Sequence, residues 1–237
     1  YFGNPVLFFT VEQSHRTLTV ESQALVEVAA PLPVDPGGTP PWEEVRARLR
    51  RPRGAEERAA VEFLFDSPRI APDDAVAAYA RPSFPPGRPV LEGVLDLTRR
   101  IHAEFAYDPA ATTVETAPAE VIRLKRGVCQ DFAHLEIACL RALGLPARYV
   151  SGYILTHPPE GAEKLVGGDA SHAWVSAYVP GSGWIDVDPT NDTVVRDEHI
   201  TLAWGRDYDD VSPLKGMVIG GADHAVGVTV DVRTVRD

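Results

Sequence analysis

The chain has 237 residues and a formal net charge of −11 at pH 7, with 44% hydrophobic and 24% charged residues. These values are ordinary for a globular protein that buries a full core, and no apolar run approaches the roughly 18 residues that a membrane helix needs. The acidic balance argues against a nucleic-acid backbone or an anionic membrane as a partner. Because the first residue is Tyr1 and not Met, we expect the chain to begin after a segment that was removed or left out.

The first part of the chain, residues 1–88, predicts a β-hairpin followed by a helical region. Residues 6–12 and 17–28 are rich in Val, Phe, Thr and Leu and partly alternate, and polar residues separate them. A proline-rich break comes next, and then helices are expected over residues 42–51, 55–65 and 73–80. A second proline-rich break, over residues 82–89, indicates a domain boundary there.

The second part, residues 89–237, is expected to contain helices first and a largely antiparallel sheet afterwards, which is typical of the α+β class. An amphipathic helix is predicted over residues 91–105, with His102 on its apolar stripe as a core or boundary residue. A short helix is expected over residues 120–125. A long helix should run from Cys129 to Leu143 and end at Gly144. The later segments with a period of two predict strands over residues 147–155, 172–179, 184–188 and 225–235.

The two cysteines, Cys129 and Cys139, fall on that long predicted helix. Ten residues of helix separate them by about 15 Å, which exceeds the roughly 7 Å between Cα atoms that a disulfide allows. Two unpaired thiols favour a reducing compartment, so the expected location is the cytoplasm. Cys139 lies among apolar residues and has the pattern of a small buried hydrophobe.

Cys129 has a different setting, at the start of the helix between Arg126 and the polar pair Gln130 and Asp131. The backbone N–H dipoles of a helix N-terminus favour a thiolate, and the same groups can receive an oxyanion. Gly127 lets the backbone turn tightly into the helix. Cys129 is therefore a candidate nucleophile.

A thiol nucleophile needs a base and an acceptor that orients the base. His172 opens one predicted strand and Asp188 closes its partner, with the turn at residues 180–183 between them. Side chains alternate with a period of two, so His172 and Asp188 share a face in every register whose paired residue numbers have an even sum. Asp186 has the same parity and is a competing partner. We expect Cys129, His172 and Asp188 to form a catalytic triad.

Several sequence blocks resemble the bacterial transglutaminase-like superfamily, whose members have a papain-like fold. The blocks are GVCQDFAH (127–134), LGLPARYVSGY (143–153), SHAWV (171–175), WIDVDPTN (184–191) and GRDYDDV (205–211). The resemblance implies a nucleophile helix packed on an antiparallel sheet or barrel, preceded by the N-terminal hairpin and helices. It also implies that Cys129, His172 and Asp188 form the triad of a thiol enzyme. Members of this kind usually carry further strands ahead of the segment that corresponds to Tyr1 of this chain.

Some positions depart from the family pattern or leave a role open. Asp186 is acidic where a neutral residue is expected, and residues 119–128 contain no glutamine to match the papain-type oxyanion donor. The N–H of Cys129 is expected to supply one oxyanion donor, and the second is unassigned. Cys129, Asp131 and His134 do not share one helical face, so structural roles are favoured over a metal site for Asp131 and His134. The acidic residues near the C-terminus, Asp207, Asp209 and Asp210, lack the calcium-loop pattern and indicate a surface loop.

The expected activity is acyl transfer from an amide, with a peptide or protein amide as substrate and without a metal or cofactor. Hydrolysis is favoured, because no lysine-binding tunnel can be read from the residues. Two alternatives stay open: a protein-glutamine transglutaminase that uses an amine acceptor, and a non-catalytic papain-fold binding module. The acceptor is not readable from the sequence, because exclusion of water is a property of the assembled cleft.

Overall fold

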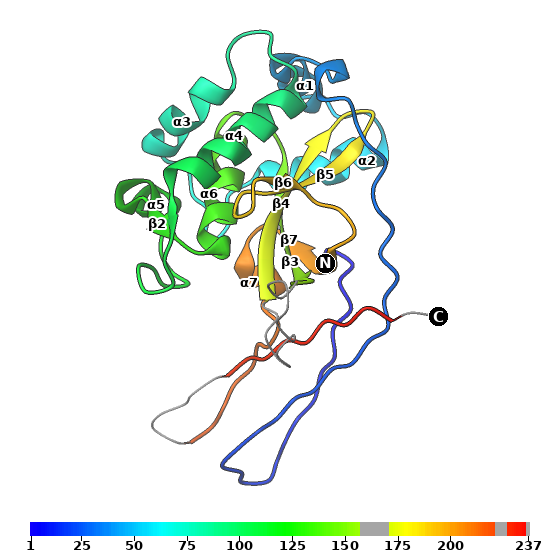
Figure 1. The fold of residues 1–237 in the computed structure, drawn as a ribbon, viewed down its shortest axis with the longest axis vertical. Coiled ribbons are helices and arrows are strands. Elements are labelled where there is room, and N and C mark those ends of the chain that lie inside the picture. The colour runs from blue at the N-terminus through cyan, green and yellow to red at the C-terminus, as the bar shows by residue number, and fades with distance from the viewer. Residues whose placement is uncertain (157–170, 221–226, 236–237) are drawn as a thin grey trace, which may run out of the picture.

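The computed structural model describes residues 1–156, 171–220 and 227–235. A five-stranded sheet has the strand order β6-β5-β4-β3-β7, and every adjacent pair in it is antiparallel. Figure 1 shows helices gathered along one side of this sheet. The strands are β3 (Ala147–Ile154), β4 (Ser171–Val179), β5 (Gly183–Asp188), β6 (Thr193–Val194) and β7 (His199–Gly205).

Helix α6 (Cys129–Ala142) lies at the centre of the molecule, packed on β3 and β4 and surrounded by other helices. All residues from 131 to 140 are buried, as expected for a helix that is enclosed on every side. It ends at Ala142, and Gly144, two residues later, has a φ of +79° that suits glycine, so the stop lies close to the predicted position. The other helices are α1 (Trp42–Leu49), α2 (Gly54–Val61), α3 (Asp74–Ala80), α4 (Val90–Glu104), α5 (Pro118–Leu124) and α7 (Tyr208–Val211).

A two-stranded parallel ladder lies just before α6. Strand β1 (Ala106–Tyr107) pairs with β2 (Arg126–Gly127), and Asp108 N–H donates to Gly127 O at 2.9 Å. Between them lies α5, which ends at Lys125 in the left-handed conformation. This ladder fixes the direction in which the chain enters α6, and therefore the place of Cys129.

Helices from both predicted domains share one hydrophobic core. Val45 of α1 and Val76 of α3 belong to the same buried cluster as Leu97 of α4 and Leu140 of α6. Pro41 forms an isolated antiparallel β-bridge with Pro89, the last residue of the second proline-rich break. The boundary after residue 88 stays a prediction, but the helices on its two sides pack together.

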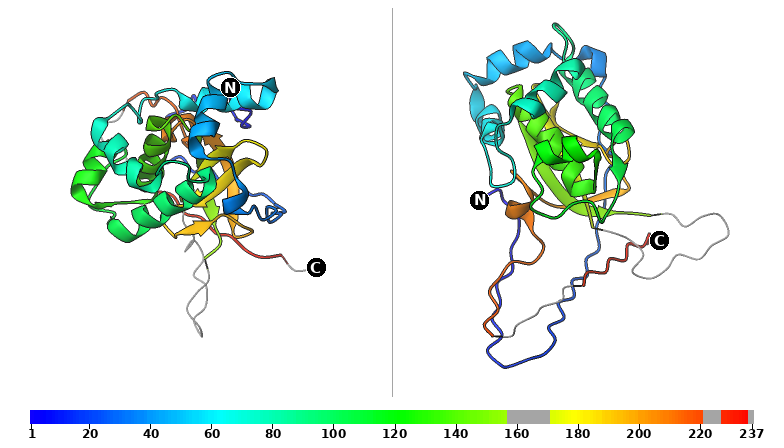
Figure 2. Two further views of the ribbon diagram at one scale, coloured as in Figure 1. Left: turned by 90° about the horizontal axis from the view of Figure 1, so that it is seen from above. Right: turned by 90° about the vertical axis from the view of Figure 1, so that its left-hand side faces the viewer.

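The predicted N-terminal hairpin is wrong in this structure. Residues 1–35 contain no helix or strand, and residues 6–28 run out from the body and back as extended chain (Figures 1 and 2). Their apolar side chains are exposed, for example Leu7 at 83% and Phe8 at 90%. An isolated hairpin is marginal in water unless one face is covered, and nothing described here covers this segment. The chain is held at Asn4, whose side chain exchanges two hydrogen bonds with the backbone of Trp204, of 2.7 and 3.1 Å.

The strand prediction also fails near the C-terminus. Residues 225 and 226 of the predicted strand lie outside the described residues, and residues 227–235 contain no strand. The sequence reading missed β7, which pairs with β3 on the side opposite β4. The register shifts at Ser151 and Gly152, where a Cβ on Gly152 would clash with Ile200 O and the ring of Trp174. In the described part of the chain, no helix is both long and apolar enough to cross a membrane.

Candidate active site

Cys129 is the first residue of α6 and is partly exposed. The imidazole of His172, near the start of β4, interacts with this thiol, and the interaction raises the pKa of His172. The first N–H groups of a helix have no partner inside the helix, so the N–H of Cys129 is available beside its own sulfur. The structure therefore places a partly exposed thiol, an imidazole and a helix N-terminus at one point.

His172 connects Cys129 to Asp188. Its Nε2 lies 2.7 Å from Asp188 Oδ2, which leaves Nδ1 for the thiol. Burial by itself lowers the pKa of His172, but the hydrogen bonds to Asp188 and Cys129 outweigh burial and raise the pKa to about 10. His172 therefore holds a proton at neutral pH, and the adjacent thiol has a cationic partner.

Asp188 is a fully buried carboxylate that accepts hydrogen bonds from several directions. Oδ2 faces His172 Nε2, His199 Nε2 at 3.1 Å and Asn191 Nδ2 at 2.6 Å. Oδ1 accepts from the backbone N–H groups of Thr190 and Asn191, at 2.9 and 3.3 Å. Burial raises the pKa of a carboxyl group, but the bonds from His172, His199 and Asn191 hold the pKa of Asp188 well below its usual range. Asp188 is therefore an anion at neutral pH.

Asp186, the competing carboxylate, points to a different partner. Its Oδ2 accepts from the indole N–H of Trp174 at 3.1 Å. The ladder pairs Asp186 with Ser176, which lies four residues from His172 along β4. The structure thus brings Cys129, His172 and Asp188 together and leaves Asp186 outside that group.

Asp131 and His134, the other polar residues of the nucleophile helix, have structural partners. Asp131 Oδ2 accepts from Val128 N–H at 2.8 Å and from Thr112 Oγ1 at 2.6 Å, which caps the start of α6. A Cβ on Gly127 would lie 2.7 Å from the same carboxylate oxygen, so glycine leaves room for this cap. His134 Nε2 accepts from Tyr208 N–H at 3.2 Å, and burial lowers the pKa of His134 to about 4.

Two further sequence expectations are corrected by the structure. His102 is exposed, not a core or boundary residue, and its Nδ1 bonds to Thr190 O at 2.9 Å. The C-terminal acidic residues are not merely surface groups. Asp207 is buried and caps α7, Asp209 pairs with Arg69 at 3.0 Å, and Asp210 pairs with Arg206 at 2.9 Å.

Glu136 is a buried titratable group close to this site. It lies on α6 two turns after Cys129 and is 0% exposed, with Oε1 accepting from Thr98 Oγ1 at 2.7 Å. Burial raises the pKa of Glu136 to about 8, and the negative charge of Asp188 acts in the same direction. At neutral pH Glu136 is therefore uncharged, so no second buried anion repels the charge of Asp188.

Comparisons with known proteins indicate the family of this chain. The model of the transglutaminase-like superfamily matches residues 77–189. An uncharacterized protein of Mycobacterium tuberculosis (strain ATCC 25618 / H37Rv) is 43% identical over 239 residues, covering 98% of this chain and 74% of that protein. A crystal structure from Cytophaga hutchinsonii, provisionally assigned as a cysteine protease, matches with 33% identity and a TM-score of 0.55. That match covers 65% of this chain and 49% of the other, so this chain spans about half of that structure.

This chain belongs to the transglutaminase-like superfamily. A relative with a named activity is a protein-glutamine gamma-glutamyltransferase of Pseudomonas aeruginosa, 38% identical over 125 residues. The match covers 52% of this chain but 18% of that protein. The helices packed on an antiparallel sheet form the papain-like transglutaminase core of the superfamily.

His199, which was not predicted from the sequence as a site residue, also contacts Asp188 in this transglutaminase-like site. His199 is the first residue of β7, and its ring lies edge-on to Trp174 with centroids 5.2 Å apart. Alternation over residues 199–205 was the available signal for this strand. Within the described residues, His172, Asp188 and His199 are the one group of three potential ligand residues whose atoms lie within 4.8 Å of one another. Since Asp188 Oδ2 already meets three hydrogen-bonding nitrogens, we describe the group as a hydrogen-bond network and assign no metal.

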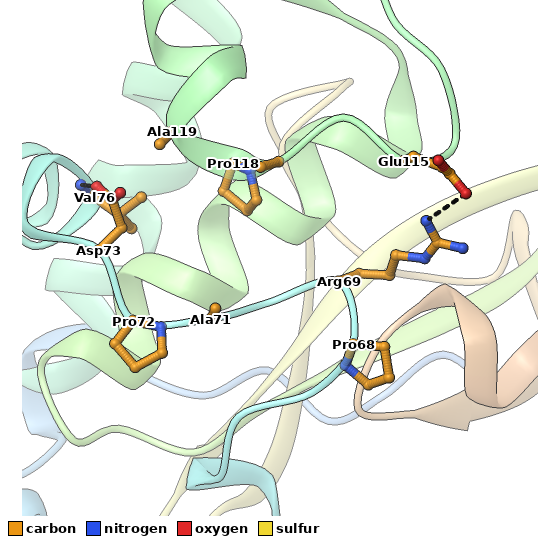
Figure 3. A pocket seen from close by; sticks show the side chains of 10 residues that line it. Pro68, Arg69, Ala71, Pro72, Asp73, Val76, Glu115, Pro118 and Ala119 are labelled. Atoms are coloured by element: carbon orange, nitrogen blue, oxygen red, sulfur yellow. Dashed lines mark hydrogen bonds and ion pairs between the residues drawn. The ribbon is translucent and has the colours of Figure 1, made fainter.

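A pocket of about 180 Å³ lies elsewhere in this transglutaminase-like core, next to the start of α5 (Figure 3). Arg69 and Glu115 face each other across its edge, with 3.8 Å between their charged atoms. Its lining includes Pro72 and Pro118 but none of Cys129, His172 and Asp188. We assign this pocket no role in the chemistry.

Proposed function

We propose that the chain is a thiol acyl-transfer enzyme that cleaves amide bonds in peptides or proteins, with water as the preferred acceptor. The observation that carries the proposal is the hydrogen bond between His172 and Asp188, together with the interaction of the same imidazole with the Cys129 thiol. Nucleophile, base and orienting carboxylate within hydrogen-bond reach are the arrangement that this chemistry needs.

In the proposed first step, the sulfur of Cys129 forms a bond to the substrate carbonyl carbon. The N–H groups at the start of α6 face the oxygen on which negative charge develops. The C–N bond then breaks, and the imidazolium of His172 gives its proton to the departing amine. This leaves a thioester between Cys129 and the acyl group.

In the second step, His172 takes a proton from the acceptor while the acceptor attacks the thioester. Water gives a carboxylic acid, and a primary amine gives a new amide; in both cases the thiol of Cys129 is released. Cys129 is partly exposed, so water has access to the acyl group, which supports hydrolysis. Asp188 stays ionised and holds the His172 ring in place.

A transglutaminase is the second candidate, and the match to the glutamyltransferase of Pseudomonas aeruginosa favours it. A non-catalytic binding module is a third candidate. Such a module has no need for an intact contact between thiol, imidazole and carboxylate, and all three are joined here.

Mass spectrometry of the protein with a glutamine-containing peptide, with and without a primary amine, distinguishes these candidates. We expect a thioester adduct on Cys129 and release of ammonia, with the acid as the main product. The amide formed from the added amine as main product would indicate a transglutaminase. Cys129→Ala should form no adduct, and Cys139→Ala, which removes the buried thiol, should behave as the wild type. Undiminished turnover by a folded Cys129→Ala protein would disprove the proposal.

A further inference from the structure

His199 contacts the same carboxylate oxygen as His172. Its Nε2 lies 3.1 Å from Asp188 Oδ2, and the corresponding distance for His172 is 2.7 Å. The ring is buried against Trp174. Strands β5 and β7 are not neighbours, because β4 and β3 lie between them in the sheet. The contact is thus made across the sheet face and does not result from cross-strand pairing.

The charge on Asp188 decides which nitrogen of His199 carries the proton. An ionised carboxylate only accepts hydrogen bonds, so Nε2 of His199 must be the donor. The other nitrogen, Nδ1, is buried and has no hydrogen-bond partner among the residues that the structure describes. A buried polar atom without a partner costs free energy, and an apolar residue would avoid that cost. The unpaired Nδ1 of His199 therefore lowers the stability of the protein, while Nε2 is directed at Asp188.

The other titratable groups around this network come from several elements. Cys129 and Glu136 of α6 face His172 and Asp188, and Asp192, after β5, acts on Glu136. Asp186 is turned away toward Trp174. Burial raises the pKa of Tyr107 and of Tyr149, and the neighbouring Cys129 acts in the same direction. In the described structure, His199 and His172 are the two imidazoles in contact with Asp188.

We propose that His199 is a positioning residue that acts through Asp188: its Nε2–H shares Asp188 Oδ2 with His172 and withdraws part of the negative charge of the carboxylate. This inference rests on the proposed function, because it concerns how Asp188 acts on the His172–Cys129 pair. Without the second donor, the carboxylate interacts more strongly with His172 and the imidazolium keeps its proton to higher pH. His199 thus limits the basicity of His172 and keeps the proton transferable to the leaving amine.

The test is the pH dependence of Cys129 alkylation by iodoacetate. An anionic reagent reacts best with a thiolate beside an imidazolium, so the rate falls at high pH when His172 loses its proton. In His199→Phe the pH at which the alkylation rate falls should be higher than in the wild type by about half to one pH unit. In His199→Gln, whose amide still donates, it should stay near the wild-type position. His15→Phe, at an exposed histidine far from Asp188 in sequence, is the matched control. A folded His199→Phe protein with the wild-type profile would overturn the proposal.

A second measurement covers the case in which His199→Phe does not fold. Nitrogen NMR of the histidine-labelled wild-type protein reports which ring nitrogen carries the proton. We expect a proton on Nε2 of His199 at neutral pH; a bare Nε2 would overturn the proposal. If wild-type Cys129 instead reacts as an ordinary thiol, with no fall at high pH, the proposed function fails. The proton position on His199 still tests its contact with Asp188 separately.

Discussion

His172 Nε2 lies 2.7 Å from Asp188 Oδ2, although the two residues are not opposite each other in the sheet. The β4–β5 ladder pairs Val175 with Val187 and Ser176 with Asp186. In the same register, Asp188 faces Trp174, and His172 lies two residues farther along β4. The contact is diagonal, which is possible because His172, Trp174, Asp186 and Asp188 all point to one face.

The two cysteines should differ strongly in reactivity. Cys129 is partly exposed beside the His172 imidazolium, whereas Cys139 is fully buried and burial raises the pKa of its thiol. Iodoacetamide at neutral pH should modify Cys129 on the order of 100-fold faster than Cys139 in the folded protein. Peptide mass mapping measures both rates, and unfolding in denaturant should make them similar. Equal rates in the folded protein would remove the evidence for a special environment at Cys129.

The two carboxylates of β5 should contribute unequally to turnover. Asp188→Asn should lower kcat by about 10²- to 10⁴-fold, because the amide loses the charge that stabilises the imidazolium. Asp186→Asn should keep turnover near the wild-type value, since an amide oxygen can still accept from Trp174 Nε1. The measurement is amide turnover, with circular dichroism to verify folding. An inactive Asp186→Asn beside an active Asp188→Asn would show that the wrong carboxylate was assigned.

Glu136 should make the protein less stable as the pH rises. In the folded state the pKa of Glu136 is raised to about 8, so it keeps its proton at pH values where the unfolded chain, with the ordinary pKa of 4.5, has lost it. The unfolded state then binds fewer protons, and the free energy of unfolding decreases between about pH 5 and pH 8, by at most about 1.4 kcal/mol per pH unit.

Glu136→Gln cannot ionise and should lack this decrease. Urea unfolding at several pH values measures it, and the difference between variant and wild type should grow in favour of the variant from pH 5 to pH 8. Glu12→Gln, at an exposed position, is the matched control and should leave the slope unchanged. Parallel profiles for Glu136→Gln and wild type would mean that Glu136 is ionised in the folded protein.

The cap on α6 should support both stability and the placement of the nucleophile. Asp131→Ala removes the acceptor of Val128 N–H and should lower the free energy of unfolding by about 1–2 kcal/mol. Thr112→Val removes one donor to the same carboxylate and leaves the cap in place, so its effect should be smaller. Urea unfolding and the alkylation rate of Cys129 are the measurements. If Thr112→Val costs as much as Asp131→Ala, the cap is not what stabilises the start of α6.

Local sequence patterns were enough to predict the elements that carry the candidate site. The apolar pattern of the nucleophile helix and its glycine stop are local properties, so the helix from Cys129 could be predicted to within one residue of its observed end. The period of two placed His172 on the same face as Asp186 and Asp188. It could not choose between the two carboxylates, because moving the register by two residues keeps every side chain on its face.

The choice between the two carboxylates depends on the assembled sheet, and so does the role of the distant segments. The hairpin turn sets the register that brings Asp188, and not Asp186, to His172. His199 reaches the same oxygen because β7 pairs with β3, a contact between residues about 50 positions apart that no local pattern encodes. The N-terminal segment has the composition of a hairpin but forms no strand, because a strand pattern needs a partner surface to bury its apolar face.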